Sequence, residues 1–355
     1  MTERARRAQI VGTGLIGGSV GLALRGHGWH VTGTDQSDAT LQRALELGAI
    51  DSIGVDEAAE ICFLAVPPGV IAEVAREMLA TTKAVVTDVG SVKGAVVEGV
   101  DNPRFVGGHP MAGSEQDGVD GSRADMFAGV VWVLTPSAAT DPEAHALVHS
   151  VVASMGSDVV TLDAVVHDRI VAMVSHVPHL TAATLMDMAA GRAAEHGAVL
   201  RLAAGGFRDM TRIAAGHPGI WPDICAENRV AIVDVLDDLI TALGTVRESV
   251  ADGDGASLAA LLGAARSARL NLPVTVGAAD AMCELRVTVA DEPGQLAAVT
   301  ALATDLDVNI YDIEIAHSVE GARGVLIIVV GVDRSNELTA ALIERGFGVS
   351  IRALT

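Results

Sequence analysis

The amino-acid sequence predicts three consecutive domains: a doubly wound α/β domain, an all-helical domain and a small ferredoxin-like domain. Apolar strand patterns alternate with helical patterns up to about residue 162. The stretch 163–280 has helical patterns without a convincing strand, and strand patterns return in 281–355. Strands that alternate with helices are typical of a parallel sheet covered on both faces, whereas helices alone indicate a separate layer or bundle.

The first predicted domain, 1–162, is built from short apolar strands. Gly, Pro and Asp flank these runs, and continuous apolar runs indicate strands that are buried on both faces. Helical patterns at 41–48 and 70–79 fall between them. We therefore expect a doubly wound parallel sheet. The predicted strands are 8–12, 29–34, 60–66, 84–87, 104–108, 130–135 and 158–162.

The second predicted domain, 163–280, carries long helical patterns. The pattern at 164–192 predicts a helix with a kink near Pro178, because proline cannot continue the hydrogen bonding of a helix. The pattern at 226–250 predicts another helix, and 271–280 is predicted to be a linker. Several of these helices are apolar on more than one face, which favours burial in a subunit interface and hence a homodimer. One apolar stripe consists of Val233, Leu236, Ile240 and Leu243.

The third predicted domain, 281–355, has its patterns in the order β-α-β-β-α-β, which is typical of a ferredoxin-like unit. No cluster of its residues has a catalytic pattern. We therefore expect a regulatory module. A dimerisation domain without a ligand is the alternative.

The composition excludes several classes of function. A formal net charge of −21 at pH 7 would repel nucleic acid and anionic membrane surfaces. No apolar run is long enough to span a bilayer, and the first residues lack the apolar segment of a secretory signal. The 3 cysteines have neither disulfide nor metal spacing, so no metal is expected. We expect a soluble cytoplasmic protein that acts on a small molecule.

A glycine fingerprint follows the first predicted strand. Gly12, Gly14 and Gly17, with Leu15 and Ile16 between them, form the pattern G-x-G-x-x-G and open a helical stretch. The first glycine permits a tight turn, the second lets backbone approach a pyrophosphate, and the third lets the helix pack closely. The helix N-terminus offers N–H groups to the phosphates. The fingerprint predicts a dinucleotide-binding Rossmann domain.

An acidic residue ends the second predicted strand. Asp35 lies 18 residues after Gly17, where a carboxylate can accept hydrogen bonds from the adenosine ribose. It would repel a 2′-phosphate, and no arginine occurs at positions 36–38. Asp35 therefore predicts NAD rather than NADP as the cofactor.

Two segments follow strands at the edge where open α/β sheets bind their ligands. Ser91 lies in the segment 88–93, and His109 begins the segment 109–115. A histidine titrates near neutral pH and can take a proton from an alcohol while hydride leaves the same carbon. His109 is therefore the candidate acid or base. The alternatives are a structural role for His109 at the strand end and local backbone bonding for Ser91.

The helical domain adds a second set of polar residues. An anionic substrate in an acidic protein needs local cations, and Arg208, Arg212 and His179 are candidates because arginine suits carboxylate binding. We expect Asp209 to pair with at least one of the arginines. His176 and His179 lack a third ligand nearby, so no metal site is expected.

Five segments, in this order, resemble the prephenate dehydrogenases of tyrosine biosynthesis: GTGLIGGSVGLAL, DVGSVKG, GGHPMAGSEQDGV, SHVPH and GGFRDMTRIA. The segment DEPGQLAAVTALATDLDVNIYDIEI resembles an ACT domain. Together the matches cover nearly the whole chain. The segments HPMAGSE and GGFRDMTR, within the third and fifth of them, are much more specific than the glycine fingerprint.

The resemblance implies roles for individual residues. His109 would hydrogen-bond the ring hydroxyl of prephenate, and Ser91 would orient that hydroxyl or that histidine. Arg212 would bind a substrate carboxylate. It further implies a homodimer through the helical domain, an active site between that domain and the Rossmann domain, and an aromatic amino-acid effector at the ACT domain. The substrate pocket would also contain His179, Trp221 and, as a gate, Glu115.

The reaction implied by the resemblance is the oxidative decarboxylation of prephenate to 4-hydroxyphenylpyruvate, with hydride transfer to NAD. An arogenate dehydrogenase is an alternative that the residues do not separate. A dehydrogenase with a lysine base would need Lys93, because Lys83 is the only other lysine. A non-catalytic amino-acid sensor is the third alternative, and it has no need for Ser91, His109 and Arg212 together.

Overall fold

The chain folds into two compact units, Met1–Arg247 and Glu248–Thr355. The computed structural model describes residues 5–113, 116, 118–195, 197–216, 218–271, 282–290, 292–317 and 323–353. The predicted linker, 271–280, lies outside the described residues except for its first position. Each unit has its own buried core.

The first unit contains a sheet of eight strands in the order β3-β2-β1-β4-β5-β6-β7-β8. The first six positions have the 3-2-1-4-5-6 order of a dinucleotide-binding fold, with its switch point between β1 and β4. Each predicted strand is present, and the short β3 is an addition. The strands are β1 (Arg7–Val11), β2 (His30–Thr34), β3 (Ser52–Ile53), β4 (Ile61–Leu64), β5 (Val85–Asp88), β6 (Phe105–Pro110), β7 (Val131–Thr135) and β8 (Asp158–Thr161).

The prediction of an entirely parallel sheet is wrong at β7. This strand pairs antiparallel with β6, and β8 pairs parallel with β7. Parallel neighbours need a crossover connection, usually a helix. In its described residues, the connection from β6 to β7 holds only the 3₁₀ turn Val119–Gly121, so the chain reverses. The helix α5 (Pro142–Ser154) then connects β7 to β8 and restores a parallel pair.

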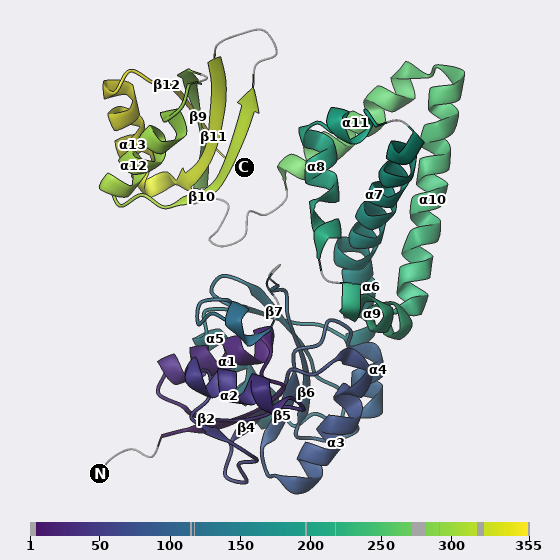
Figure 1. The fold of residues 1–355 in the computed structure, drawn as a ribbon, viewed down its shortest axis with the longest axis vertical. Coiled ribbons are helices and arrows are strands. Elements are labelled where there is room, and N and C mark those ends of the chain that lie inside the picture. Colours follow the sequence, from purple (N-terminus) through teal and green to yellow (C-terminus); the bar gives the residue numbers. More distant parts are fainter. Residues whose placement is uncertain are drawn as a thin grey trace. The chain divides into compact units, whose positions relative to one another are not determined.

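Helices cover both faces of this sheet (Figure 1). One buried cluster joins the strands to α1 (Leu15–Gly26), α2 (Asp38–Glu46) and α5. A second cluster joins them to α3 (Ile71–Thr81) and α4 (Gly94–Gly99). The strand interiors are therefore buried on both sides, which is why they form continuous apolar runs in the sequence.

Helices follow the sheet in the remainder of the first unit. The predicted break near Pro178 is a π-helical turn, Ala172–His176, between α6 (Ala164–Val171) and α7 (Val177–Glu195). Proline lacks an N–H and its ring crowds the carbonyl four residues earlier, so a regular α-helix cannot continue through this position. The other helices are α8 (Gly205–Thr211), α9 (Trp221–Glu227) and α10 (Arg229–Asp252).

The apolar stripe predicted on α10 is not buried within the single chain. Val233, Ile240 and Leu243 are 47%, 64% and 55% exposed, whereas Leu236 packs against a small core cluster. Many neighbouring apolar side chains on α6 and the π-helical turn are also exposed. Exposed apolar surface of this kind is typical of a protein interface. Within the described ranges, no helix is long and apolar enough to cross a membrane.

The second unit has the predicted β-α-β-β-α-β order after an additional helix, α11 (Gly255–Leu270). Its four strands form an antiparallel sheet in the order β10-β11-β9-β12. One buried cluster joins the sheet to α12 and α13. The elements are β9 (Met282–Ala290), α12 (Gln295–Asp305), β10 (Ile310–His317), β11 (Arg323–Gly331), α13 (Val332–Glu344) and β12 (Gly348–Ala353).

Candidate active site

The glycine turn between β1 and α1 is tightly packed except at its middle glycine. Gly12 has a φ of +88°, and a Cβ atom there would lie 2.3 Å from the carbonyl oxygen of Ala65. A Cβ on Gly17 would lie 1.9 Å from the carbonyl oxygen of Gly12. A Cβ on Gly14 would meet nothing within 4 Å among the described atoms. Space is therefore open at the N-terminus of α1, where N–H groups favour a phosphate.

Asp35 lies beside this turn. Its carboxylate accepts hydrogen bonds from the backbone N–H groups of Thr13, at 2.7 Å, and of Ser37, at 2.9 Å. A carboxylate has about four lone-pair positions, so capacity is left for ribose hydroxyls. The turn and the acid together fit the pyrophosphate and ribose of NAD.

A pocket of about 360 Å³ connects the glycine turn to the predicted chemical site. Ser91 and His109 lie in its wall together with Gly14, Leu15 and Ile16. Ser91 follows β5 and His109 is near the end of β6, so both reach the carboxyl edge of the sheet. The other lining residues are Ala65, Val66, Pro67, Pro68, Val89, Gly90, Pro110, Ala112, Ile220 and Ile224.

The predicted substrate residues from the helical segment do not line this pocket. Trp221 lies between two lining residues, Ile220 and Ile224, and its ring stacks on that of His179 at 3.7 Å between centroids. Arg212 is exposed at the start of the 3₁₀ turn Arg212–Ala215. The predicted gate residue, Glu115, lies outside the described residues.

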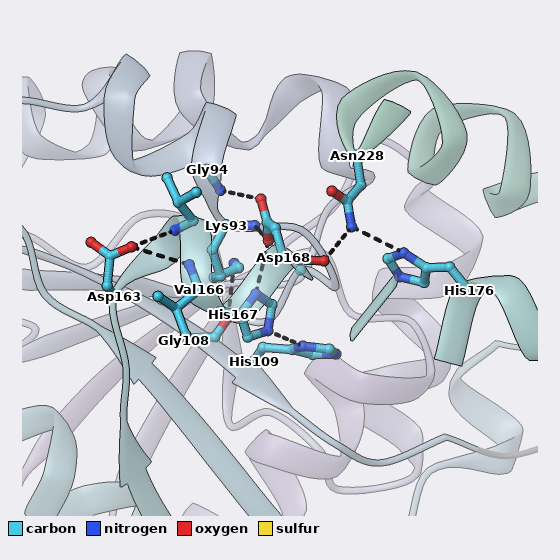
Figure 2. Close-up of polar contacts among 12 residues, drawn as sticks. Lys93, Gly94, Gly108, His109, Asp163, Val166, His167, Asp168, His176 and Asn228 are labelled. Atoms are coloured by element: carbon cyan, nitrogen blue, oxygen red, sulfur yellow. Dashed lines mark hydrogen bonds and ion pairs between the residues drawn. The ribbon is translucent and has the colours of Figure 1, made fainter. Parts of the chain in front are cut away.

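His109 is one end of a buried chain of side chains that the sequence did not predict (Figure 2). Its Nδ1 lies 2.8 Å from Nε2 of His167, and Nδ1 of His167 lies 2.8 Å from the carboxylate of Asp168. That carboxylate also accepts hydrogen bonds from the backbone N–H groups of Lys93, at 2.8 Å, and Gly94, at 2.7 Å. His167 and Asp168 belong to α6, whereas His109 belongs to β6.

Burial lowers the pKa of His109 well below its usual range, and the nearby His167, Lys93 and His176 lower it further. Only 8% of the residue is exposed. The imidazole is therefore neutral at pH 7, which is the form that can accept a proton. Burial likewise lowers the pKa of His176 to about 4, although Asp168 opposes this shift.

A buried ion pair joins the segment that carries Ser91 to strand β6, which carries His109. Lys93 and Asp88 are both fully buried and bonded to one another. Lys93 Nζ also donates to the carbonyl of Gly108, at 2.9 Å. The Asp88 carboxylate accepts hydrogen bonds from the N–H groups of Gly90 and Gly108, at 2.9 and 3.0 Å. Lys93 is thus enclosed in an ion pair, which argues against it as a catalytic base.

The strand order, the glycine turn and the pocket define a dinucleotide-binding protein of the Rossmann class. Residues 20–161 match the family model for the nucleotide-binding domain of prephenate dehydrogenase, and residues 163–264 match the model for its dimerization domain. The chain belongs to the prephenate dehydrogenase family.

Named relatives match most of the chain. It is 33% identical to a prephenate dehydrogenase from Bacillus subtilis, over 94% of this chain and 95% of that protein. It is 34% identical to a cyclohexadienyl dehydrogenase from Zymomonas mobilis, over 74% of this chain and 94% of that protein.

Solved structures are similar in fold as well as in sequence. Prephenate dehydrogenase from A. aeolicus, solved in complex with hydroxyphenyl propionate and NAD+, has a TM-score of 0.72 and 30% identity. The match covers 77% of this chain and 100% of that one. Arogenate dehydrogenase from Synechocystis has a TM-score of 0.65 and 31% identity, over 74% and 98% of the two chains.

Proposed function

We propose that this chain is an NAD-dependent dehydrogenase that converts prephenate to 4-hydroxyphenylpyruvate by oxidative decarboxylation. The observation that carries the proposal is a neutral, buried His109 in the wall of the pocket that also contains the glycine turn. The family membership and the relatives support the same activity.

In the proposed mechanism, His109 acts as a base. Prephenate carries a hydroxyl at C4 of a cyclohexadiene ring, opposite a carboxylate at C1. His109 accepts the hydroxyl proton, and Ser91 orients the hydroxyl from the same pocket wall. The chemistry that bound NAD supplies is acceptance of hydride from C4. Loss of carbon dioxide from C1 makes the ring aromatic, so the protein mainly orients and polarises the substrate.

The proposed substrate clamp comes from the helical segment. Arg212 would bind a carboxylate of the substrate, with His179, Trp221 and Glu115 around it. The turn that begins at Arg212 is followed by Ile220 and Ile224, which line the pocket. Arginine binds carboxylates through two parallel hydrogen bonds, which suits an anionic substrate in an acidic protein.

Replacing Arg212 by alanine is expected to raise the KM for prephenate by about 10- to 100-fold, the range of a charge-assisted hydrogen bond, with little change in kcat. Steady-state kinetics measured by NADH absorbance test this result. Arg201→Ala removes an exposed arginine from another turn and serves as the control. An unchanged KM in Arg212→Ala would remove Arg212 from the clamp.

Replacing Asp35 by alanine is expected to weaken NAD binding by about 10- to 100-fold, because the ribose loses a charged hydrogen-bond acceptor. The variant should also show a smaller preference for NAD over NADP. Equilibrium binding of both cofactors measures the change. Asp38→Ala, which removes an exposed carboxylate from the first turn of α2, should leave both affinities nearly unchanged. An unaltered cofactor preference in Asp35→Ala would show that Asp35 does not contact the ribose.

The experiment that tests the proposed function is NADH formation by the purified chain with prephenate and with arogenate, each combined with NAD and with NADP. The proposal predicts the fastest turnover with prephenate and NAD. Arogenate dehydrogenase is the second candidate, because the Synechocystis enzyme of that name has a TM-score of 0.65 to this chain. Faster turnover with arogenate would identify arogenate, rather than prephenate, as the substrate. No NADH formation with either substrate would contradict the proposal.

We further propose three domains, 1–162, 163–280 and 281–355, and a homodimer formed by the helical domain. The exposed apolar side chains of α10 support the dimer, and the dimerization family model covers 163–264. The three cysteines are unpaired, which is consistent with a reducing cytoplasm.

We propose that 281–355 is an ACT domain with an aromatic amino-acid effector. Repeating the NADH assay with added tyrosine tests this assignment.

A further inference from the structure

We infer that His167 and Asp168 are positioning residues that fix the tautomer of His109, so that the substrate faces its unprotonated Nε2 atom. The inference rests on the proposed role of His109 as the base. Beyond that role, it identifies the nitrogen of His109 that accepts the proton and the residues that determine this choice. Figure 2 shows the three side chains in one continuous row.

The carboxylate of Asp168 is the fixed end of this row. It accepts hydrogen bonds from the backbone N–H groups of Lys93 and Gly94, and these groups can only donate. These two hydrogen bonds require acceptor oxygens on Asp168. Nδ1 of His167 lies 2.8 Å from one of these oxygens, so this nitrogen must carry a proton and donate it.

The protonation of the two histidines follows from that end. A neutral His167 that is protonated at Nδ1 has a lone pair at Nε2. Nε2 of His167 lies 2.8 Å from Nδ1 of His109, so Nδ1 of His109 must be the donor. The lone pair of a neutral His109 is then at Nε2, on the side of the ring away from His167 (Figure 2). Proton transfer from an alcohol requires this lone pair.

The row is anchored at its backbone as well. The side-chain amide of Asn228 donates to the main-chain carbonyl of Asp168, at 2.8 Å, and lies 3.2 Å from Nδ1 of His176. Asn228 precedes α10, and His176 ends the π-helical turn. All five residues are at least nine-tenths buried. Residues of the helical segment thus hold His109, the proposed base on β6, in one orientation.

Two substitutions of His167 separate the two hydrogen bonds that it makes. His167→Asn places an amide near the position of Nδ1, so it can keep the contact with Asp168 but offers His109 no acceptor. His167→Gln places an amide oxygen near the position of Nε2, so it can accept from His109 but loses the contact with Asp168. Asparagine and glutamine carry the same amide group, so each of the two variants serves as a control for the other.

We expect His167→Asn to lower kcat by at least about 10-fold, since a wrong tautomer in a catalytic histidine is known to cost up to about 10⁴. The KM for prephenate should stay within about 3-fold of wild type. His167→Gln should keep kcat within about 3-fold. His149→Asn, an exposed histidine on α5, is the control and should match wild type. Equal losses in the two His167 variants, or no loss in His167→Asn, would overturn the inference.

Nitrogen NMR of histidine-labelled protein gives a readout that does not depend on activity. The resonances of His109 are assigned as those that disappear in His109→Asn. We expect a protonated Nδ1 and a bare Nε2 in wild type, and an increase of the opposite tautomer in His167→Asn. A wild-type His109 protonated at Nε2 would overturn the inference. The expected tautomer in a protein that does not oxidise prephenate would instead count against the proposed function.

Discussion

Replacing His109 by asparagine is expected to lower kcat for prephenate oxidation by about 10²–10⁴, the usual contribution of a positioned acid or base. Asparagine retains a hydrogen-bonding side chain near the pocket wall but cannot accept the hydroxyl proton. The dissociation constant of NAD should change little, because the predicted cofactor contacts come from the glycine turn and Asp35. Steady-state kinetics and cofactor titration measure the two quantities.

The matched control is the same substitution at an exposed histidine of α5, His149→Asn, which should leave kcat unchanged. Circular dichroism of both variants checks the fold. A kcat of His109→Asn near that of wild type would mean that another group accepts the proton. A large loss of NAD affinity alongside kcat would indicate that His109 supports the cofactor site rather than the chemistry.

Replacing Lys93 by methionine is expected to lower the free energy of unfolding by about 3–5 kcal/mol, because it leaves the buried carboxylate of Asp88 without its counter-ion. Lys93 and Asp88 have no exposed side-chain surface, so water cannot compensate for the lost charge. Denaturant unfolding followed by tryptophan fluorescence measures the effect. The protein's 3 tryptophans, Trp29, Trp132 and Trp221, all lie in the first unit, so the signal reports that unit.

The control is Arg43→Met, which breaks an exposed ion pair with Asp120 on the same unit and should cost no more than about 1 kcal/mol. The double variant Asp88→Asn/Lys93→Met should recover part of the loss, since the uncompensated charge is then removed as well. A loss below about 1 kcal/mol in Lys93→Met would show that the ion pair does not hold the segment of Ser91 to strand β6.

The sequence predicted the strands of the first unit because their continuous apolar runs follow directly from burial on both faces of the sheet. It did not predict the reversal at β7, since an apolar run contains no information about strand direction. The decisive feature is the missing crossover helix after β6, and glycine-rich segments such as 107–113 are compatible with either direction. The break near Pro178 was predicted, and its π-helical form was not.

The candidate site was predicted in part. Ser91, His109 and Gly14 come together because they follow strands that end at one edge of the sheet, a relation that the order of elements determines. His167 contacts His109 across 58 positions of sequence, and no spacing rule connects a helix start with a strand end. The adjacent His167 and Asp168 form one signal that was available, since two buried polar residues in the first turns of a helix need partners.

The role of His109 as the base is tested by a crystal structure of the chain with NAD and 4-hydroxyphenylpyruvate bound. The quantity to measure is the distance from Nε2 of His109 to the ring hydroxyl oxygen. We predict a hydrogen-bond distance, about 2.6–3.2 Å, with Nδ1 still directed at His167. A hydroxyl bound beyond the reach of Nε2, or an imidazole turned so that Nε2 faces His167, would contradict it.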